Sequence, residues 1–177
     1  MNENTAAIAK IVKRSMVNLL ELVEKAAPGH SANEIGRLKE QARRTALTMI
    51  AVIALTDDRH AQKGAVLINC LGEGGENPGA ECLHDQAGLW NSISSEIPRF
   101  FRLAAEHDEK VHTGVAREII HELRLIGDAV CITDGYFQAV EHEVLRRYLS
   151  VLESFLTARK AQADSQPARG THGWESA

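Results

Sequence analysis

A short internal repeat constrains the fold of this chain more than any other feature of its sequence. Residues 51–58 (AVIALTDD) align without gaps on residues 128–135 (DAVCITDG), and the copies share a Thr-Asp pair preceded by three apolar positions. In each copy an acidic corner and a second amphipathic segment follow. Because such a repeat indicates one structural unit used twice, we predict two helical hairpins related by an approximate twofold axis. They should pack through the helices that end in Thr56 and Thr133.

Helical spacing of apolar residues extends along most of the chain. The first helix is predicted from about Glu3 to Ala26, where Pro28-Gly29 ends it, and the second from the capping-box pattern Ser31-Ala-Asn-Glu34 to about Thr56. Further helices are predicted at about 61–71, 81–93, 98–107, 111–133 and 138–161. No segment alternates as a strand does, so the sequence predicts an all-α bundle of about six to seven helices without a sheet. The apolar run ALTMIAVIAL at residues 46–55 should lie at its centre.

Several residues are predicted to form the core of the second half. Trp90, Phe100 and Phe101 should anchor it, and Gly127 inside a helix indicates a close approach between helices. The inward face of the helix at 111–133 is predicted to carry Val111, Val115, Ile119, Leu123, Ile126 and Val130. That of the last helix should carry Val140, Val144, Tyr148, Val151, Leu152 and Phe155.

Composition and charge restrict the class of protein. With 20 Lys and Arg against 24 Asp and Glu, the formal charge of −4 argues against a dedicated nucleic-acid binder, and the longest apolar run is too short to span a membrane. Three cysteines without paired spacing indicate free thiols in a reducing compartment, so a cytoplasmic protein is expected. We predict an N-terminal helix at 1–30, a duplicated domain at 31–162 and a disordered tail at 163–177.

The second copy of the repeat resembles a known family. In IGDAVCITDGYFQAVEHEVLRRYLSVLESFL, an apolar helix end is followed by Asp134, Gly135, Phe137 and Glu141, a pattern similar to the second half of TerB-like tellurite-resistance domains. The stretch from Leu89 to Gly114 also resembles TerB-like regions attached to AAA-type ATPases of type VII-like secretion and stress systems. The likeness covers about residues 40–158. In the first copy, however, Asp58 replaces the Gly and Gly64 stands where the Glu would be.

The resemblance implies an all-helical, duplicated, non-enzymatic domain of bacterial stress resistance whose acidic corners bind a divalent metal ion. If both corners lie at one end of the bundle, Asp57, Asp58, Asp134 and Glu141 meet there, and their oxygens suit Ca²⁺, Mg²⁺ or Mn²⁺, with Zn²⁺ a further candidate. The competing interpretation is that these acids cap helices. The protein would then be an interaction module for an AAA-type ATPase or a type VII-like secretion system, or a homo-oligomer, with no metal.

Other patterns support weaker hypotheses. Glu118 and His121 have the spacing found in di-iron bundles, but charged positions on an amphipathic helix usually face solvent, so an exposed polar face is the better interpretation. His121, Glu122 and Asp128 could be outer partners of the second corner. Cys70, Cys82 and His84 lack the paired spacing of structural zinc sites. A phosphate-binding loop and a nucleophile elbow are both absent from the sequence, and no catalytic residue is predicted.

Overall fold

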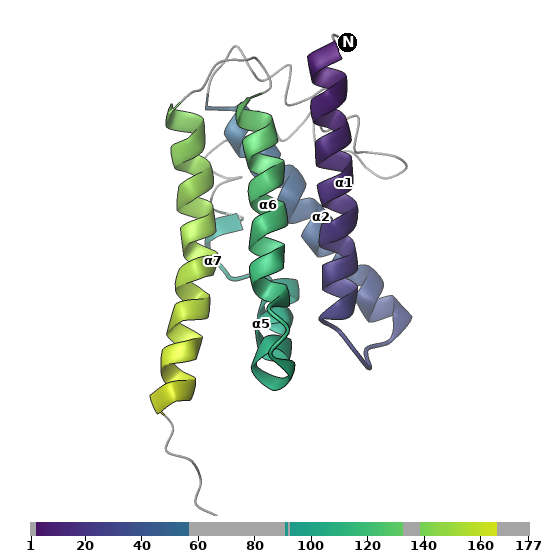
Figure 1. The fold of residues 1–177 in the computed structure, drawn as a ribbon, viewed down its shortest axis with the longest axis vertical. Coiled ribbons are helices and arrows are strands. Elements are labelled where there is room, and N and C mark those ends of the chain that lie inside the picture. Colours follow the sequence, from purple (N-terminus) through teal and green to yellow (C-terminus); the bar gives the residue numbers. More distant parts are fainter. Residues whose placement is uncertain (1–2, 57–90, 92, 133–138, 166–177) are drawn as a thin grey trace, which may run out of the picture.

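The computed structural model describes residues 3–56, 91, 93–132 and 139–165, and every regular element in these ranges is an α-helix. The helices are α1 (Glu3–Lys25), α2 (Ala32–Ala54), α5 (Arg99–Val111), α6 (Val115–Cys131) and α7 (Ala139–Ser165). Figure 1 shows α1, α6 and α7 in one layer, with α2 and α5 packed behind them. The all-α fold is therefore confirmed, with five helices over the described ranges instead of six to seven.

The two segments predicted as helices at 61–71 and 81–93 fall almost wholly outside the described residues. At the end of the second, Asn91 and residues 93–94 are helical. The start of α2 agrees closely with its sequence signal. Glu34 N–H donates to the Ser31 hydroxyl, and the Glu34 carboxylate accepts from Ser31 N–H, which completes the capping box.

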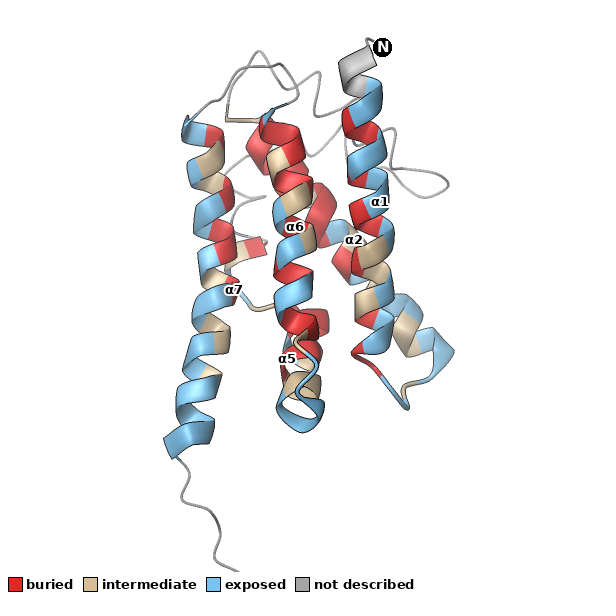
Figure 2. Cartoon of the chain, in the orientation of Figure 1, coloured by how far each residue is buried: buried red, intermediate tan, exposed pale blue. Residues whose placement is uncertain are grey.

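One hydrophobic core joins all five helices. Figure 2 shows the buried residues concentrated where the two layers meet, and the second half of α2 is buried almost continuously, which confirms the prediction for the run at 46–55. Phe100 and Phe101 are fully buried as predicted, while Trp90 lies outside the described residues. The core also includes Val12, Leu19 and Val23, so α1 is part of the same packed unit as the repeat.

The predicted helix at 111–133 in fact begins at Val115, and Val111 is exposed at the end of α5. The break has two local causes. His112 and Gly114 adopt left-handed backbone conformations, with φ of 55° and 77°. The Asp108 carboxylate then accepts hydrogen bonds from the N–H groups of Val115 and Ala116, both at 2.8 Å, and so caps α6.

The start of α5 at Arg99 agrees with the predicted start at about 98, but its N-cap Pro98 offers no side-chain bond. The Gln41 side chain of α2 accepts a hydrogen bond from Phe100 N–H at 3.2 Å instead. A residue 59 positions earlier in the chain thus satisfies one of the free amides at the start of α5.

The inward face of α7 is rotated relative to the predicted one. Val140 is 59% exposed and Val144 and Val151 are half-buried, whereas Glu141, Leu145 and Leu149 are buried together with Tyr148 and Leu152. Leu145 sits directly over Gly127 of α6, where an added Cβ would lie 2.4 Å from a Leu145 methyl carbon. The predicted close approach at Gly127 is confirmed, and it fixes the rotation of α7.

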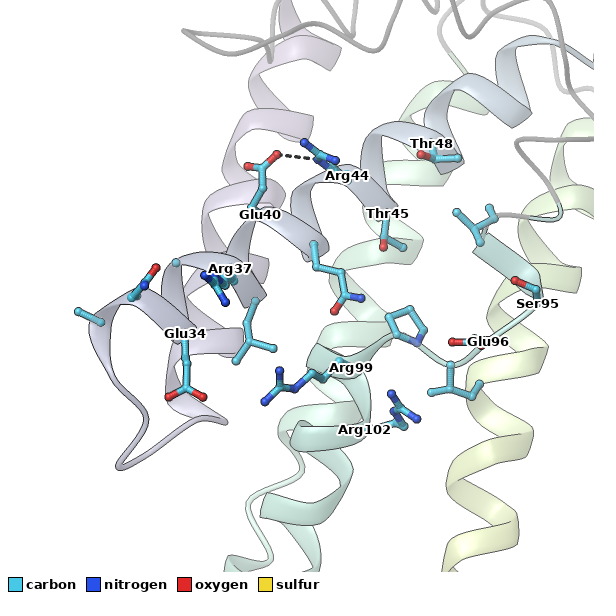
Figure 3. A pocket seen from close by; sticks show the side chains of 18 residues that line it. Glu34, Arg37, Glu40, Arg44, Thr45, Thr48, Ser95, Glu96, Arg99 and Arg102 are labelled. Atoms are coloured by element: carbon cyan, nitrogen blue, oxygen red, sulfur yellow. Dashed lines mark hydrogen bonds and ion pairs between the residues drawn. The ribbon is translucent and has the colours of Figure 1, made fainter.

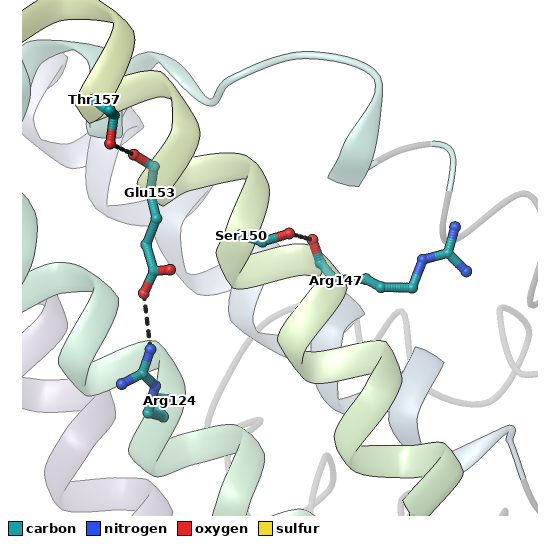
Figure 4. A network of polar contacts seen from close by, with 5 residues as sticks. All are labelled: Arg124, Arg147, Ser150, Glu153 and Thr157. Atoms are coloured by element: carbon teal, nitrogen blue, oxygen red, sulfur yellow. Dashed lines mark hydrogen bonds and ion pairs between the residues drawn. The ribbon is translucent and has the colours of Figure 1, made fainter.

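The outer face of α7 is polar (Figure 4). Arg124 of α6 donates to the Glu153 carboxylate at 2.8 Å, and the Ser150 and Thr157 hydroxyls donate to backbone carbonyls one turn earlier. The helix runs through Ser165, past the predicted domain limit at 162, and the rest of the predicted tail lies outside the described residues. Within the described ranges, no helix has the length and apolarity needed to cross a bilayer.

Candidate functional site

Of the four predicted metal ligands, Glu141 alone belongs to the described residues. Asp57, Asp58 and Asp134 lie outside them, as do Cys70, Cys82 and His84. The flanking helices are nevertheless well placed. α2 and α6 pack against each other, as the repeat predicted, and their C-terminal ends lie at the same end of the bundle as the beginning of α7 (Figure 1). Glu141 therefore lies at the end of the molecule where both corners begin.

Glu141 is in the first turn of α7 and is only 3% exposed. Its neighbour Val140 is 59% exposed, so the helix turns a carboxylate inward and a valine outward. Burying an ionised carboxylate is costly unless hydrogen bonds or positive charge compensate it. Glu141 is not without an interaction partner, and its place in the first turn of α7 makes it a candidate ligand.

Cys131 is a cysteine in the last turn of α6. The Cys131 thiol is fully buried, and its pKa is raised to about 12, first by burial and then by the negative charges of Glu141 and Asp128. Both carboxylates are therefore close enough to the end of α6 to act on this sulfur. A thiol held neutral in this way is a poor metal ligand and a poor nucleophile, since both roles need the thiolate.

His142 of α7 is a further polar residue between the end of α6 and the start of α7. His142 Nδ1 lies 3.7 Å from Asp128 Oδ1, so a protonated His142 forms an ion pair across the two helices. The second corner itself lies outside the described residues, so the roles of Asp128 and Glu122 as its outer partners stay predictions. Glu122 accepts a hydrogen bond from Asn18 of α1 at 3.1 Å. Glu118 and His121 are both exposed, which confirms the exposed polar face.

The described residues do not by themselves form a metal site, because no three His, Cys, Asp or Glu side chains among them are grouped to hold an ion. Glu141 could contribute one or two oxygen ligands. The remaining ligands of a hard cation would have to come from the acids at the corners.

A second feature, which the sequence interpretation missed, is a groove of about 1040 Å³ between α2 and the segment at 93–102 (Figure 3). Its floor and walls combine apolar side chains, hydroxyl groups and charges. Four arginines line it: Arg37 and Arg44 from α2, and Arg99 and Arg102 from α5. Three glutamates, Glu34, Glu40 and Glu96, line it as well.

A signal for this groove exists in the sequence, although it is weak. Arg37 and Arg44 are seven residues apart and so lie on one face of α2. Arg99 and Arg102 follow directly after Pro98, in the first turn of a helix, where acidic residues are the usual choice. What the sequence could not supply is the packing of α5 against α2.

Comparison with family models, with curated proteins and with solved structures finds no match to this chain. The resemblance to TerB-like domains therefore stays a hypothesis that depends on the residues of the second copy.

Proposed function

We propose that this chain is a non-enzymatic, TerB-like helical protein that binds a divalent metal ion at its acidic corners, in a tellurite-type or general stress-resistance pathway. The ligands would be Asp57, Asp58, Asp134 and Glu141, and the ion Ca²⁺, Mg²⁺, Mn²⁺ or Zn²⁺. The position of Glu141 is the observation that carries this proposal, since this carboxylate lies in the first turn of α7, at the end of the bundle where α2 and α6 end (Figure 1).

The arrangement of the helices also supports a shared site. The ends of α2 and α6 and the start of α7 lie at one end of the bundle, so the chain leaves and re-enters the described fold there (Figure 1). Carboxylates that lie close together repel each other. A cation bound between them attracts each carboxylate and so offsets that repulsion.

Thermal unfolding of metal-free protein during titration with each of the four ions tests the proposal. A true ligand raises the midpoint in proportion to the logarithm of its concentration, because it binds the native state alone. Glu141→Gln is the most informative variant, since the amide keeps the shape of the side chain. It should abolish the gain with metal by removing one anionic oxygen ligand.

Two further variants sharpen the test. Asp134→Ala should abolish the gain, whereas Glu118→Gln, an exposed acid on α6, should leave it intact. The proposal fails if no ion shifts the midpoint, or if Glu141→Gln and Asp134→Ala both retain the full shift.

A protein-interaction role is the second candidate, with an AAA-type ATPase of a type VII-like system or a second copy of the chain as partner and no metal. The open groove between α2 and α5 favours it, since unpaired arginines on a surface are typical of recognition sites. Binding of a partner would then be unaffected by chelators and by Glu141→Gln. Sedimentation analysis with and without EDTA separates self-association from a metal effect.

A further inference from the structure

Three of the four arginines in the groove between α2 and α5 make no ion pair with the part of the chain that the structure describes. Arg44 is bonded to Glu40 at 3.0 Å, but Arg37, Arg99 and Arg102 have no hydrogen bond or ion pair with any described residue. All three side chains are exposed, and they reach the groove from both of its sides, Arg37 from α2 and the other two from α5 (Figure 3).

The three glutamates of the groove offset only part of the positive charge of its four arginines. Glu40 forms an ion pair with Arg44. Glu34 accepts hydrogen bonds from the backbone N–H and the hydroxyl of Ser31 in the capping box. Those bonds hold the pKa of Glu34 below its ordinary value, with a smaller contribution from the charge of Arg99. Among the described residues that line the groove, four arginines stand against three glutamates, which leaves a net charge of +1.

The placement of Arg99 and Arg102 opposes helix stability. Both lie in the first turn of α5, where the aligned peptide dipoles present partial positive charge, and this turn contains no acidic residue. Positive charge at this position destabilises an isolated helix. Acidic residues in this turn would stabilise the helix more than arginines do. A role of the two arginines in binding a negatively charged ligand explains why they are found there.

We propose that this groove binds an acidic peptide segment of a partner protein, with Arg37, Arg99 and Arg102 contacting its carboxylates. The wall between Ala32 and Thr48 extends for about 24 Å at the helical rise of 1.5 Å per residue, which accommodates about seven residues of extended peptide. Leu38, Ile93 and Ile97 offer apolar contacts between the charges. The inference rests on the second candidate function, the protein-interaction role, and adds that the partner presents an acidic segment. It does not depend on the metal site.

Nucleic acid fits the groove less well than a peptide does. A nucleic acid carries one charge at every phosphate, so part of its backbone would lie against Glu34, Glu40 and Glu96. A peptide can place neutral residues next to these acids and carboxylates next to the arginines. The overall charge of −4 also disfavours a polyanion.

Fluorescence anisotropy with the full chain tests the proposal. The probe is a fluorescein-labelled dodecapeptide of Glu-Leu-Gly repeats, compared with the same peptide carrying Gln for Glu and with a single-stranded oligonucleotide of similar length. We expect the acidic peptide to bind at least about tenfold more tightly than either control. The triple variant Arg37→Gln, Arg99→Gln, Arg102→Gln should lose that preference.

A matched control removes the same charge elsewhere. Lys10→Gln, Arg14→Gln, Lys110→Gln neutralises three exposed cations outside the groove, and it should retain binding within about twofold. Circular dichroism establishes that both triple variants keep the wild-type helix content. Equal loss in the two variants, equal binding of the oligonucleotide, or no binding of the acidic peptide by the wild type would overturn the proposal.

The metal proposal is tested independently by the same measurement. Glu141→Gln and EDTA should leave the anisotropy signal unchanged. If the triple variant binds normally while a partner still associates with the chain, the interaction role holds and the groove is not its site.

Discussion

At the scale of single residues, Cys131 and Tyr148 are buried acids whose neutral forms the fold favours. Burial raises the pKa of both groups, and for Cys131 the charges of Glu141 and Asp128 add to the effect. Native Cys131 keeps its proton up to about pH 12, whereas the unfolded chain loses it near the ordinary value of 9.0. Between these values the native state binds more protons than the unfolded state, so stability falls as pH rises.

We therefore predict that the free energy of unfolding decreases between pH 9 and about 12, by roughly 4 kcal/mol through Cys131 alone. Urea denaturation at a series of pH values measures this slope. Cys131→Ala should flatten it, and Tyr148→Phe should remove a further part above pH 10. Identical slopes in the wild type and Cys131→Ala would show that the native thiol ionises freely.

The sequence alone does not decide which face of α7 is buried, and the inward position of Glu141 is one result of that choice. Val140, Val144 and Val151 define a plausible apolar face for α7, yet the helix buries the face one residue further on. The sequence contains both faces, because Leu145 and Leu149 compete with the valines. The choice between them depends on the packing of Leu145 over Gly127, which is a contact between helices.

At the scale of helices, two glycines inside helices should respond to alanine in opposite ways. Gly36 of α2 has open space around the position of a Cβ, so Gly36→Ala should stabilise the protein by about 0.5–1 kcal/mol. Gly127→Ala gains the same helix propensity but places its methyl 2.4 Å from a carbon of Leu145, which is buried and cannot swing into solvent. Overpacking of this kind costs about 1–3 kcal/mol.

Chemical denaturation of the two variants measures this difference. We expect Gly36→Ala to raise the midpoint and Gly127→Ala to lower it, with equal denaturant dependence in both. A gain from Gly127→Ala comparable to that from Gly36→Ala would mean that α6 and α7 separate at no cost.

Helix boundaries were predictable where the signal is local and not where it comes from elsewhere in the chain. The start of α2 follows from Ser31 and Glu34, which are three residues apart. The break before α6 could not be predicted, because apolar spacing continues from Val111 to Val115 across it. Asp108 decides this boundary by capping α6 from the preceding helix, and Gln41 caps α5 from a helix much earlier in the sequence.

At the scale of the whole molecule, α1 lies outside the repeat but inside the core. It packs most extensively against α6 and also contacts α2, and Val12, Leu19 and Val23 are almost completely buried. The hydrogen bond from Asn18 to Glu122 adds a polar contact to the interface with α6. The repeat predicts the unit 31–162 as a domain, whereas the packing places α1 within that domain's core.

We therefore predict that the fragment 31–177 does not fold cooperatively. Without α1, the apolar faces of α2 and α6 that contact it would be exposed to water, and each large apolar side chain then loses about 1.5–3 kcal/mol of burial. That loss approaches the whole stability of a typical domain. The fragment should retain helical circular dichroism, bind a hydrophobic dye and melt without a sharp transition.

The fragment 1–165, which keeps all five described helices, is the matched control and should unfold with the midpoint of the full chain. Adding a peptide of residues 1–30 to the fragment 31–177 should restore a cooperative transition, because the contacts with α6 and α2 are then re-formed between two chains. A sharp transition in 31–177 alone would instead establish the repeat as an independent domain and α1 as an addition to it. In that case the repeated unit alone would specify a stable domain, as the sequence analysis predicts for residues 31–162.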